Sequence, residues 1–413
     1  MNKKLKIVAI GLYVPGSGFT RVLTSLFERL QLQYDIHWLG IGYKKPRIKT
    51  NGYTLYPTNL EGGDLYAAFQ MEALVKELKA DFIFILNDFW MFKNYERVIK
   101  TLDPKPISVA YIPLDGKIDN PHDVEDTLFL DHLICYTDYA LEQTLQAYSK
   151  LSESNIPKSH VIPHGTDVQD FYPLNQRQIP DLFLDRTSLK SEIFPSISNP
   201  EDSFIVLNAN RISERKALHL TIDGFAQFAK DKPNAYLCFH IPNTPEFLLN
   251  KLRAKIEASG VSDQIILNPL GDKYVSNPVL NRLYNACDVG VNTSMGEGWG
   301  MIAFEHGATG AAQIVPDHTA CQELWKDYGE LLEVKEWRVL DNNPFTMGEI
   351  DPLALQKSLE KLYNDKSYLL EMSKKALQHS ASDCYNWTTI ASSWNKVLKE
   401  AKTLAKTTKS VLI

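Results

Sequence analysis

The sequence predicts an α/β protein of two domains, each built on a doubly wound parallel sheet. Short apolar runs typical of buried strands alternate with segments of helical periodicity along most of the chain. This rhythm is lost once, over about residues 174–202, where Pro180, Pro195 and Pro200 collect, and it then begins again. The length of 413 residues is also about twice what one ordinary core supports.

The first half of the chain contains six apolar runs that are predicted to be strands. They cover residues 7–13, 36–39, 81–86, 108–112, 132–136 and 160–163. Apolar residues recur at helical spacing from Val22 to Leu30, and a second helix is predicted to end over residues 76–80. The order predicts a first domain over residues 1–175 and a linker over residues 176–202.

The second half repeats the pattern. Strands are predicted over residues 203–208, 235–240, 264–267, 289–292 and 313–315. A helix is predicted over residues 218–229, and the second domain over residues 203–384. Ligands of open parallel sheets bind beyond the carboxyl ends of the strands, so polar residues directly after a strand are the candidates for a site.

Charge and cysteine content exclude several classes of function. Lys and Arg total 44 against 50 Asp and Glu, and a net charge of −6 excludes broad nucleic-acid binding driven by net charge. The five cysteines contain no Cys-x-x-Cys pair, which argues against a disulfide framework or a zinc site and favours a reducing cytosol. The basic start and apolar residues 7–14 imitate a signal peptide, but no cleavage site follows, so a buried first strand is expected. No apolar run reaches the roughly 18 residues of a membrane span.

The most specific motif is a glycine-rich loop after a predicted strand of the second half. Gly296, Gly298 and Gly300 permit a tight turn and a close approach of the backbone to a ligand. The apolar residues that follow predict a helix start, whose free N–H groups favour phosphate. Glu297 would face a sugar from the loop, and Glu305 would face ribose hydroxyls from the helix, with a diphosphate between them. A surface turn with a solvated glutamate is the alternative.

Basic residues follow the strand predicted at residues 203–208. Arg211 and Lys216 could converge on one anion, Arg as a bidentate fork and Lys as a point charge. Alone, this pair is weak evidence for a binding site, because basic residues at helix starts are usually solvated. The glycine-rich loop in the same half strengthens the interpretation that Arg211 and Lys216 bind an anion.

These motifs resemble those of the retaining nucleotide-sugar glycosyltransferases of family 4. Residues 296–305 resemble the Glu-x7-Glu motif of the family, and residues 210–216 resemble its diphosphate-binding segment. Residues 163–174 resemble the signature before the interdomain linker. The resemblance implies a GT-B fold, in which two Rossmann-like domains face a central cleft and residues 385–413 form a closing helix that returns to the first domain.

The resemblance also assigns donor-side roles. Glu297 would contact the transferred sugar, Glu305 would bind the donor ribose, and Arg211 and Lys216 would neutralise the diphosphate. The backbone amides of Gly300 and Met301, at the start of the helix after the glycine-rich loop, would contact the phosphates. Gly298 and Trp299 would lie beside the sugar.

The implied activity is transfer of a hexose from a UDP-, GDP- or ADP-sugar to a sugar or lipid-linked (glycan) acceptor, with retention of the anomeric configuration. Same-face attack is expected rather than a covalent sugar–enzyme intermediate. The chain contains no Asp-x-Asp pair, so no metal ion and no other cofactor are expected.

The first half offers weaker candidates. Gly16 and Gly18 follow the first strand, but Arg21 stands in the place of the third glycine of a dinucleotide motif. In family 4 this loop closes over the phosphates and the acceptor, which is the role expected here.

Polar residues after two further strands are acceptor-side candidates. Many family members carry a His after a middle strand, whereas this chain has Asp115, which is expected to hydrogen-bond the sugar or the acceptor. An Asp-Gly turn is the alternative. Asn87 and Asp88 are also candidates, with a helix cap as the alternative.

Other residues receive structural interpretations. His164 is expected to be hydrogen-bonded in the hinge, and Trp337 to pack rather than to stack on a ligand. Thr319 and Ala320 stand where family members often carry Gly-Gly, which could reshape the sugar pocket. Five lysines recur at near-helical spacing between residues 396 and 409, and this face could touch anionic lipid at the inner face of a membrane. A solvated terminal helix in a cytoplasmic protein is the favoured account.

Two other classes of function stay open. One is a catalytically silent GT-B subunit that supports a partner enzyme. The other is a GT-B epimerase or phosphorylase, which would act without a separate acceptor or with free phosphate.

Overall fold

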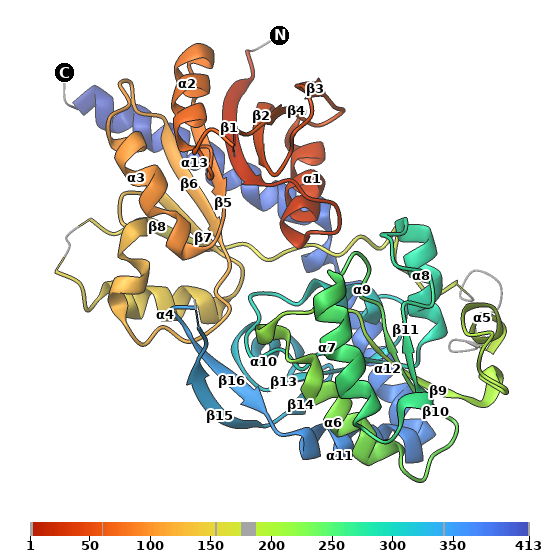
Figure 1. Cartoon of the computed structure of the whole chain (residues 1–413). Helices are drawn as coiled ribbons and strands as arrows, with labels where there is room; N and C mark the ends of the chain where they lie inside the picture. The colour runs from red at the N-terminus through yellow and green to blue at the C-terminus, as the bar shows by residue number, and fades with distance from the viewer. Residues whose placement is uncertain (1–2, 60, 153–154, 175–186, 342, 412–413) are drawn as a thin grey trace. The chain divides into compact units, whose positions relative to one another are not determined.

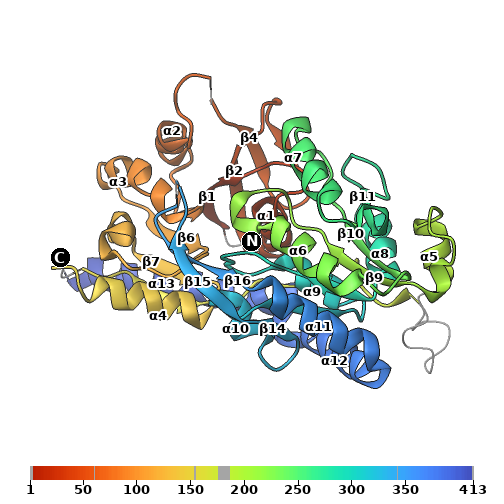
Figure 2. The same cartoon turned by 60° about the horizontal axis from the view of Figure 1, so that its bottom comes forward.

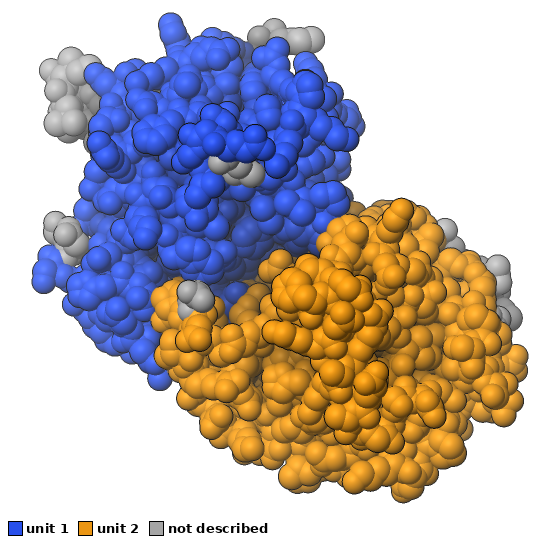
Figure 3. All heavy atoms as spheres, viewed as in Figure 1, with its two compact units in different colours: residues 1–165, 384–413 blue, residues 166–383 orange. Residues whose placement is uncertain are grey.

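The computed structural model describes residues 3–59, 61–152, 155–174, 187–341 and 343–411. The chain forms two compact units, one of residues 1–165 with 384–413 and the other of residues 166–383 (Figure 3). None of the helices within the described residues is long and apolar enough to cross a membrane.

Unit 1 is a doubly wound α/β unit (Figure 1). Eight strands of its described part form one sheet: β1 (Leu5–Leu12), β2 (Tyr34–Ile41), β3 (Ile48–Lys49), β4 (Thr54–Pro57), β5 (Phe82–Leu86), β6 (Ile107–Ile112), β7 (His132–Cys135) and β8 (Lys158–Val161). Its main helices are α1 (Gly18–Leu30), α2 (Ala68–Leu78), α3 (Lys93–Lys100), α4 (Asp138–Tyr148) and α13 (Trp387–Val411).

The strand order in this sheet is β3-β4-β2-β1-β5-β6-β7-β8. Every pairing is parallel except that of β3 with β4. The central strands are buried on both faces, which explains why they read as unbroken apolar runs in the sequence. All six strands predicted for this half are present.

The C-terminal helix α13 completes the core of unit 1. Trp394 is fully buried, with its ring 4.9 Å from both Phe84 and Tyr111. Lys402 lies in the predicted basic face, yet its Nζ is 2.5 Å from the Asp81 carboxylate. Part of that face therefore forms an ion pair within unit 1 and is not available to a membrane. The side chains of Lys406 and Lys409 lie outside the described residues.

Unit 2 carries a six-stranded parallel sheet and a separate hairpin in its described part. The strands are β9 (Phe204–Asn208), β10 (Ala235–Phe239), β11 (Ile265–Leu267), β12 (Val289–Val291), β13 (Ala312–Pro316), β14 (Glu330–Leu332), and the hairpin pair β15 (Val334–Val339) and β16 (Thr346–Ile350). The helices are α5 (Thr187–Ile193), α6 (Leu218–Ala229), α7 (Glu246–Glu257), α8 (Asn277–Ala286), α9 (Met301–Gly307), α10 (Thr319–Trp325), α11 (Pro352–Asn364) and α12 (Lys366–Ser380). Helix α11 packs against α6 and α12 (Figure 2).

The division between the units differs from the predicted boundary at residue 175. Residues 166–174 belong to unit 2, where Phe171 is buried in a core that also contains Ile193 and Ile197. Residues 175–186 of the predicted linker lie outside the described residues, and residues 187–202 pack on unit 2. Apolar side chains thus anchor much of the proline-rich segment that the sequence suggested was a linker.

Candidate functional site

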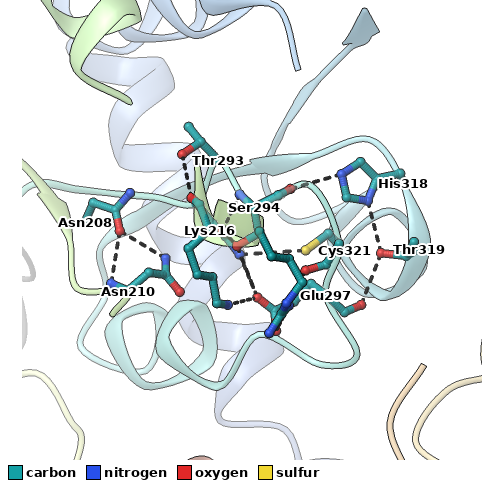
Figure 4. Close-up of polar contacts among 12 residues, drawn as sticks. Asn208, Asn210, Lys216, Thr293, Ser294, Glu297, His318, Thr319 and Cys321 are labelled. Carbon is teal, nitrogen blue, oxygen red and sulfur yellow. Dashed lines mark hydrogen bonds and ion pairs between the residues drawn. The ribbon is translucent and has the colours of Figure 1, made fainter. Parts of the chain in front are cut away.

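The two motifs of the second half lie at the point of unit 2 where the strand order reverses. The order is β11-β10-β9-β12-β13-β14, so the chain winds outward in one direction from β9 and in the other from β12. Strands β9 and β12 are parallel neighbours. The loops that follow them, which carry Lys216 and Glu297, therefore meet at the switch point where ligands of such sheets bind (Figure 4).

Lys216 and Glu297 form a buried ion pair at this switch point. Lys216 ends the short helix η5 (Glu214–Lys216), and its Nζ donates a hydrogen bond to Oε2 of Glu297. Both residues are 8% exposed. Burial raises the pKa of Glu297, but the charges of Lys216 and Arg215 outweigh burial and lower this pKa to about 2. The carboxylate is therefore ionised at neutral pH.

Arg215 was not among the predicted site residues, yet it lies at the centre of the site. Its Nη1 donates to the carbonyl oxygen of Gly296 and is 3.9 Å from Oε1 of Glu297. Its own carbonyl oxygen accepts a hydrogen bond of 2.7 Å from the amide of Met295. Arg211, which was predicted to bind diphosphate, follows β9 on the same segment and is exposed.

Buried polar side chains fix the start of the glycine-rich loop. Oδ1 of Asn292 accepts hydrogen bonds from the amide of Ser294 at 2.9 Å and from its hydroxyl at 2.6 Å. Nδ2 of Asn292 donates to Oε2 of Glu297 at 3.4 Å. On the neighbouring loop, Oδ1 of Asn208 accepts from the amide and the side chain of Asn210, each at 3.0 Å.

Two residues at the start of α10 complete the site. Thr319 Oγ1 lies 3.1 Å from the carbonyl oxygen of Glu297, and Nε2 of His318 lies 3.1 Å from that of Ser294 (Figure 4). The sequence suggested that Thr319 could reshape the sugar pocket, but it predicted no role for His318 and no contact of either residue with the glycine-rich loop. The available signal was their position directly after β13, which precedes the same edge of the sheet.

The second glutamate lies on α9. Gly300 caps this helix with a φ of +86°, a conformation that glycine adopts without strain, and Met301 is the first residue of α9. Glu305 is 4% exposed and accepts a hydrogen bond of 3.5 Å from the hydroxyl of Tyr284. Trp299 stacks on Phe304 with ring centroids 4.9 Å apart. Gly298, Gly300 and Glu305 thus belong to one continuous turn and helix with Glu297.

The candidates of the first half belong to unit 1. They follow β1, β5 and β6, which are adjacent strands of its sheet. Gly16 is exposed with a φ of +75°, and Gly18 begins α1. Asn87 is buried and donates to the hydroxyl of Tyr95 at 2.6 Å, which favours a structural role.

Asp88 and Asp115 lie around one buried phenol. Burial raises the pKa of Tyr136 well above its ordinary value, and the charges of Tyr111, Asp88 and Asp115 raise it further. His164 forms a hydrogen bond of 2.7 Å with the hydroxyl of Tyr111, which confirms that it is hydrogen-bonded, and burial lowers its pKa to about 3. Within the described ranges, no group of three or more His, Cys, Asp or Glu side chains could hold a metal ion.

The two doubly wound units and the switch-point site define the GT-B class of fold. Sucrose-phosphate synthase of Thermosynechococcus elongatus aligns with a TM-score of 0.71 at 16% identity, covering 96% of this chain and 99% of that one. Anabaena HepE in complex with UDP-glucose aligns with a TM-score of 0.70 at 14% identity, covering 96% and 100% of the two chains. The predicted fold class is confirmed.

The sequence comparisons match the second half of the chain. Residues 190–379 match the family model described as Glycosyl transferases group 1. Mannosylfructose-phosphate synthase of Agrobacterium fabrum is 28% identical over 195 residues, which are 46% of this chain. The match spans 38% of the length of that relative.

Proposed function

We propose that the chain is a retaining glycosyltransferase that moves a hexose from a nucleotide diphosphate sugar to a sugar or lipid-linked acceptor. One observation carries the proposal. Lys216 and the ionised Glu297 are held together at the switch point of unit 2, inside the segment that matches the group 1 family.

The donor would lie along the edge of unit 2. Lys216 and the exposed Arg211 would neutralise the diphosphate, and the amides of Gly300 and Met301 would add hydrogen bonds to its oxygens. Glu305 would accept hydrogen bonds from the ribose hydroxyls. Lys216 is paired with Glu297 in the structure, so a bound diphosphate would share the lysine with that carboxylate.

These residues would act most strongly when the glycosidic bond breaks. Negative charge grows on the departing diphosphate, so fixed cationic groups beside it stabilise the transition state more than the ground state. Glu297, flanked by Gly298 and Trp299, would accept hydrogen bonds from hydroxyls of the transferred sugar. The proposal requires no metal ion or other cofactor, because Lys216 and Arg211 would supply the positive charge.

The comparisons suggest the first substrates to try. HepE was solved with UDP-glucose, and the sequence relative is named as a sugar-phosphate synthase. We therefore propose UDP-glucose as the first donor and a hexose phosphate as the first acceptor. Asp115 and Asp88 of unit 1 would serve the acceptor side, and the loop of Gly16 and Gly18 would contact the donor diphosphate. We also propose that the chain works in the cytoplasm. Lys396 and Lys399, which belong to the predicted basic face, are exposed on α13.

Thermal-shift screening of the purified chain against UDP-, GDP- and ADP-sugars tests the proposal, because a ligand that binds only the folded state raises the melting temperature. Stabilisation by one nucleotide sugar, followed by NMR detection of a retained anomeric linkage in the product, is expected. Interconversion of donor sugars without an acceptor would indicate an epimerase, and binding without turnover would indicate a silent subunit. Indifference to every nucleotide sugar would contradict the proposal.

A further inference from the structure

We propose that Thr319 is a positioning residue for Glu297, and that its hydroxyl group links the backbone of the glycine-rich loop to the ring of His318. The inference rests on the proposed function, because Glu297 is the residue proposed to bind the transferred sugar. It adds a specific element, the start of α10, to a site otherwise built from the loops after β9 and β12.

The backbone of Thr319 is in a conformation that threonine rarely adopts. Its φ is +50°, in the left-handed region, where a β-branched side chain is an outlier. The residue is 3% exposed. Such a conformation persists only where the surroundings enforce it, and it concentrates at functional sites. Glycine would satisfy this backbone without strain, so the threonine side chain itself requires an explanation.

The hydroxyl of Thr319 has two acceptors. It lies 3.1 Å from the carbonyl oxygen of Glu297 and 3.1 Å from Nδ1 of His318. Burial lowers the pKa of His318 to about 4, so the ring is neutral at pH 7. Its Nε2 faces the carbonyl oxygen of Ser294, which only accepts, so Nε2 carries the ring proton and Nδ1 is an acceptor. The hydroxyl proton can therefore be shared between the ring and the loop.

These contacts hold the loop from outside at both ends of a short turn. His318 binds the carbonyl of Ser294, and Thr319 binds the carbonyl of Glu297 three residues later. The His318 ring in turn lies against Trp337 of β15, with ring centroids 5.9 Å apart. Because reacting groups lose much of their effect when displaced by about 1 Å, a contact that fixes the Glu297 backbone affects turnover even though Thr319 does not contact substrate.

A set of substitutions at residue 319 separates the hydroxyl from the backbone. Thr319→Ser keeps the hydroxyl, Thr319→Val keeps the shape without it, Thr319→Ala loses both the hydroxyl and the branched shape, and Thr319→Gly also removes the backbone strain. We expect kcat within about twofold of the native value for Ser and about five- to tenfold lower for Val, Ala and Gly, as for loss of one hydrogen bond. The melting temperature should follow a different order, with Gly above Ala.

The decisive result is that kcat and melting temperature follow different orders across the four variants. KM for the donor should be nearly constant in all of them. Lys79→Gly is the matched control, because Lys79 has a φ of +53° at the end of α2 in unit 1; it should leave kcat unchanged. Native kcat in Thr319→Val, or a kcat that follows melting temperature across the set, would overturn the inference.

A second readout does not depend on turnover. Loss of the hydroxyl should shift the Nδ1 resonance of His318 in the NMR spectrum of Thr319→Val, and Thr319→Ser should restore it. If the native chain binds no nucleotide sugar, the proposed function fails, and an unchanged His318 resonance would separately overturn the link made by Thr319.

Discussion

Lys216 donates a hydrogen bond from Nζ to Oε2 of Glu297, and this ion pair is buried within unit 2. Removing one partner of such a pair leaves an uncompensated charge out of water, which strongly destabilises the folded state. The pair, which is proposed to bind the donor, is therefore also a point at which single substitutions should strongly lower the free energy of unfolding.

A double-mutant cycle measures this penalty. Lys216→Met leaves the Glu297 carboxylate without its closest cation and should lower the free energy of unfolding by about 3–5 kcal/mol. Glu297→Gln should cost a similar amount, and the double variant should recover a large part of it. Urea denaturation gives the three values. The exposed pair Lys375 and Glu371 is the control, with an expected coupling below about 1 kcal/mol; additive costs at Lys216 and Glu297 would refute the coupling.

The two arginines of the loop after β9 should behave differently. Arg211→Ala removes an exposed side chain, so the melting temperature should be nearly unchanged while the Kd for UDP rises about tenfold or more. Arg215→Ala removes the donor to the Gly296 carbonyl and should lower the free energy of unfolding by about 1–3 kcal/mol. Calorimetric titration with UDP and thermal denaturation separate the two effects. Equal UDP affinity in Arg211→Ala and the native chain would remove Arg211 from the donor site.

Substitutions of Asn87 and Asp115 in unit 1 should likewise have different effects, the first on stability and the second on transfer to the acceptor. Asn87→Ala breaks a buried hydrogen bond to Tyr95 and should cost about 1–3 kcal/mol of stability. Asp115→Asn should keep slow donor hydrolysis and lower transfer to the acceptor about tenfold or more, as for loss of general acid–base or positioning function. The ratio of transfer to hydrolysis is the measurement. A ratio equal to that of the native chain would leave Asp115 as an ordinary turn residue.

Acid should destabilise unit 1 through His164. Burial lowers its pKa to about 3 in the folded state, against about 6.5 when unfolded. Below pH 6.5 the unfolded chain binds a proton that the folded chain does not, so stability falls by about 1.4 kcal/mol per pH unit down to the folded pKa. His164→Gln should flatten this slope between pH 6.5 and 5, measured by urea denaturation. His122→Gln, at an exposed position, is the control, and an unchanged slope in His164→Gln would contradict the assignment.

The sequence predicted the buried strands because central parallel strands are apolar on both faces. Residues 203–208 became β9, and the helix predicted at residues 218–229 is α6. The hairpin was not predicted, because β15 has the sequence Val-Lys-Glu-Trp-Arg-Val along a largely exposed strand, without alternation of apolar and polar residues. Contacts made by segments distant in sequence, such as Ile193 in the core of unit 2, were likewise invisible.

The candidate site was predicted to the level of its loops. Glu297 and Lys216 lie in recognisable sequence motifs, and the strand order explains why the loops that contain them are close together. Arg215 could not be chosen over Arg211, because the turn of η5 decides which side chain reaches the loop. The left-handed backbone of Thr319 is opposite to what its residue type suggests, so only the structure could reveal it.

The helix α13 has a consequence for the order in which the protein is made. Unit 2 is continuous over residues 166–383, whereas unit 1 needs residues 384–413 to bury the face that Trp394 covers. A ribosome therefore delivers the full sequence of unit 2 before that of unit 1, although unit 1 begins first. Until α13 emerges during synthesis, the face of the first sheet that Trp394 covers lacks this packing.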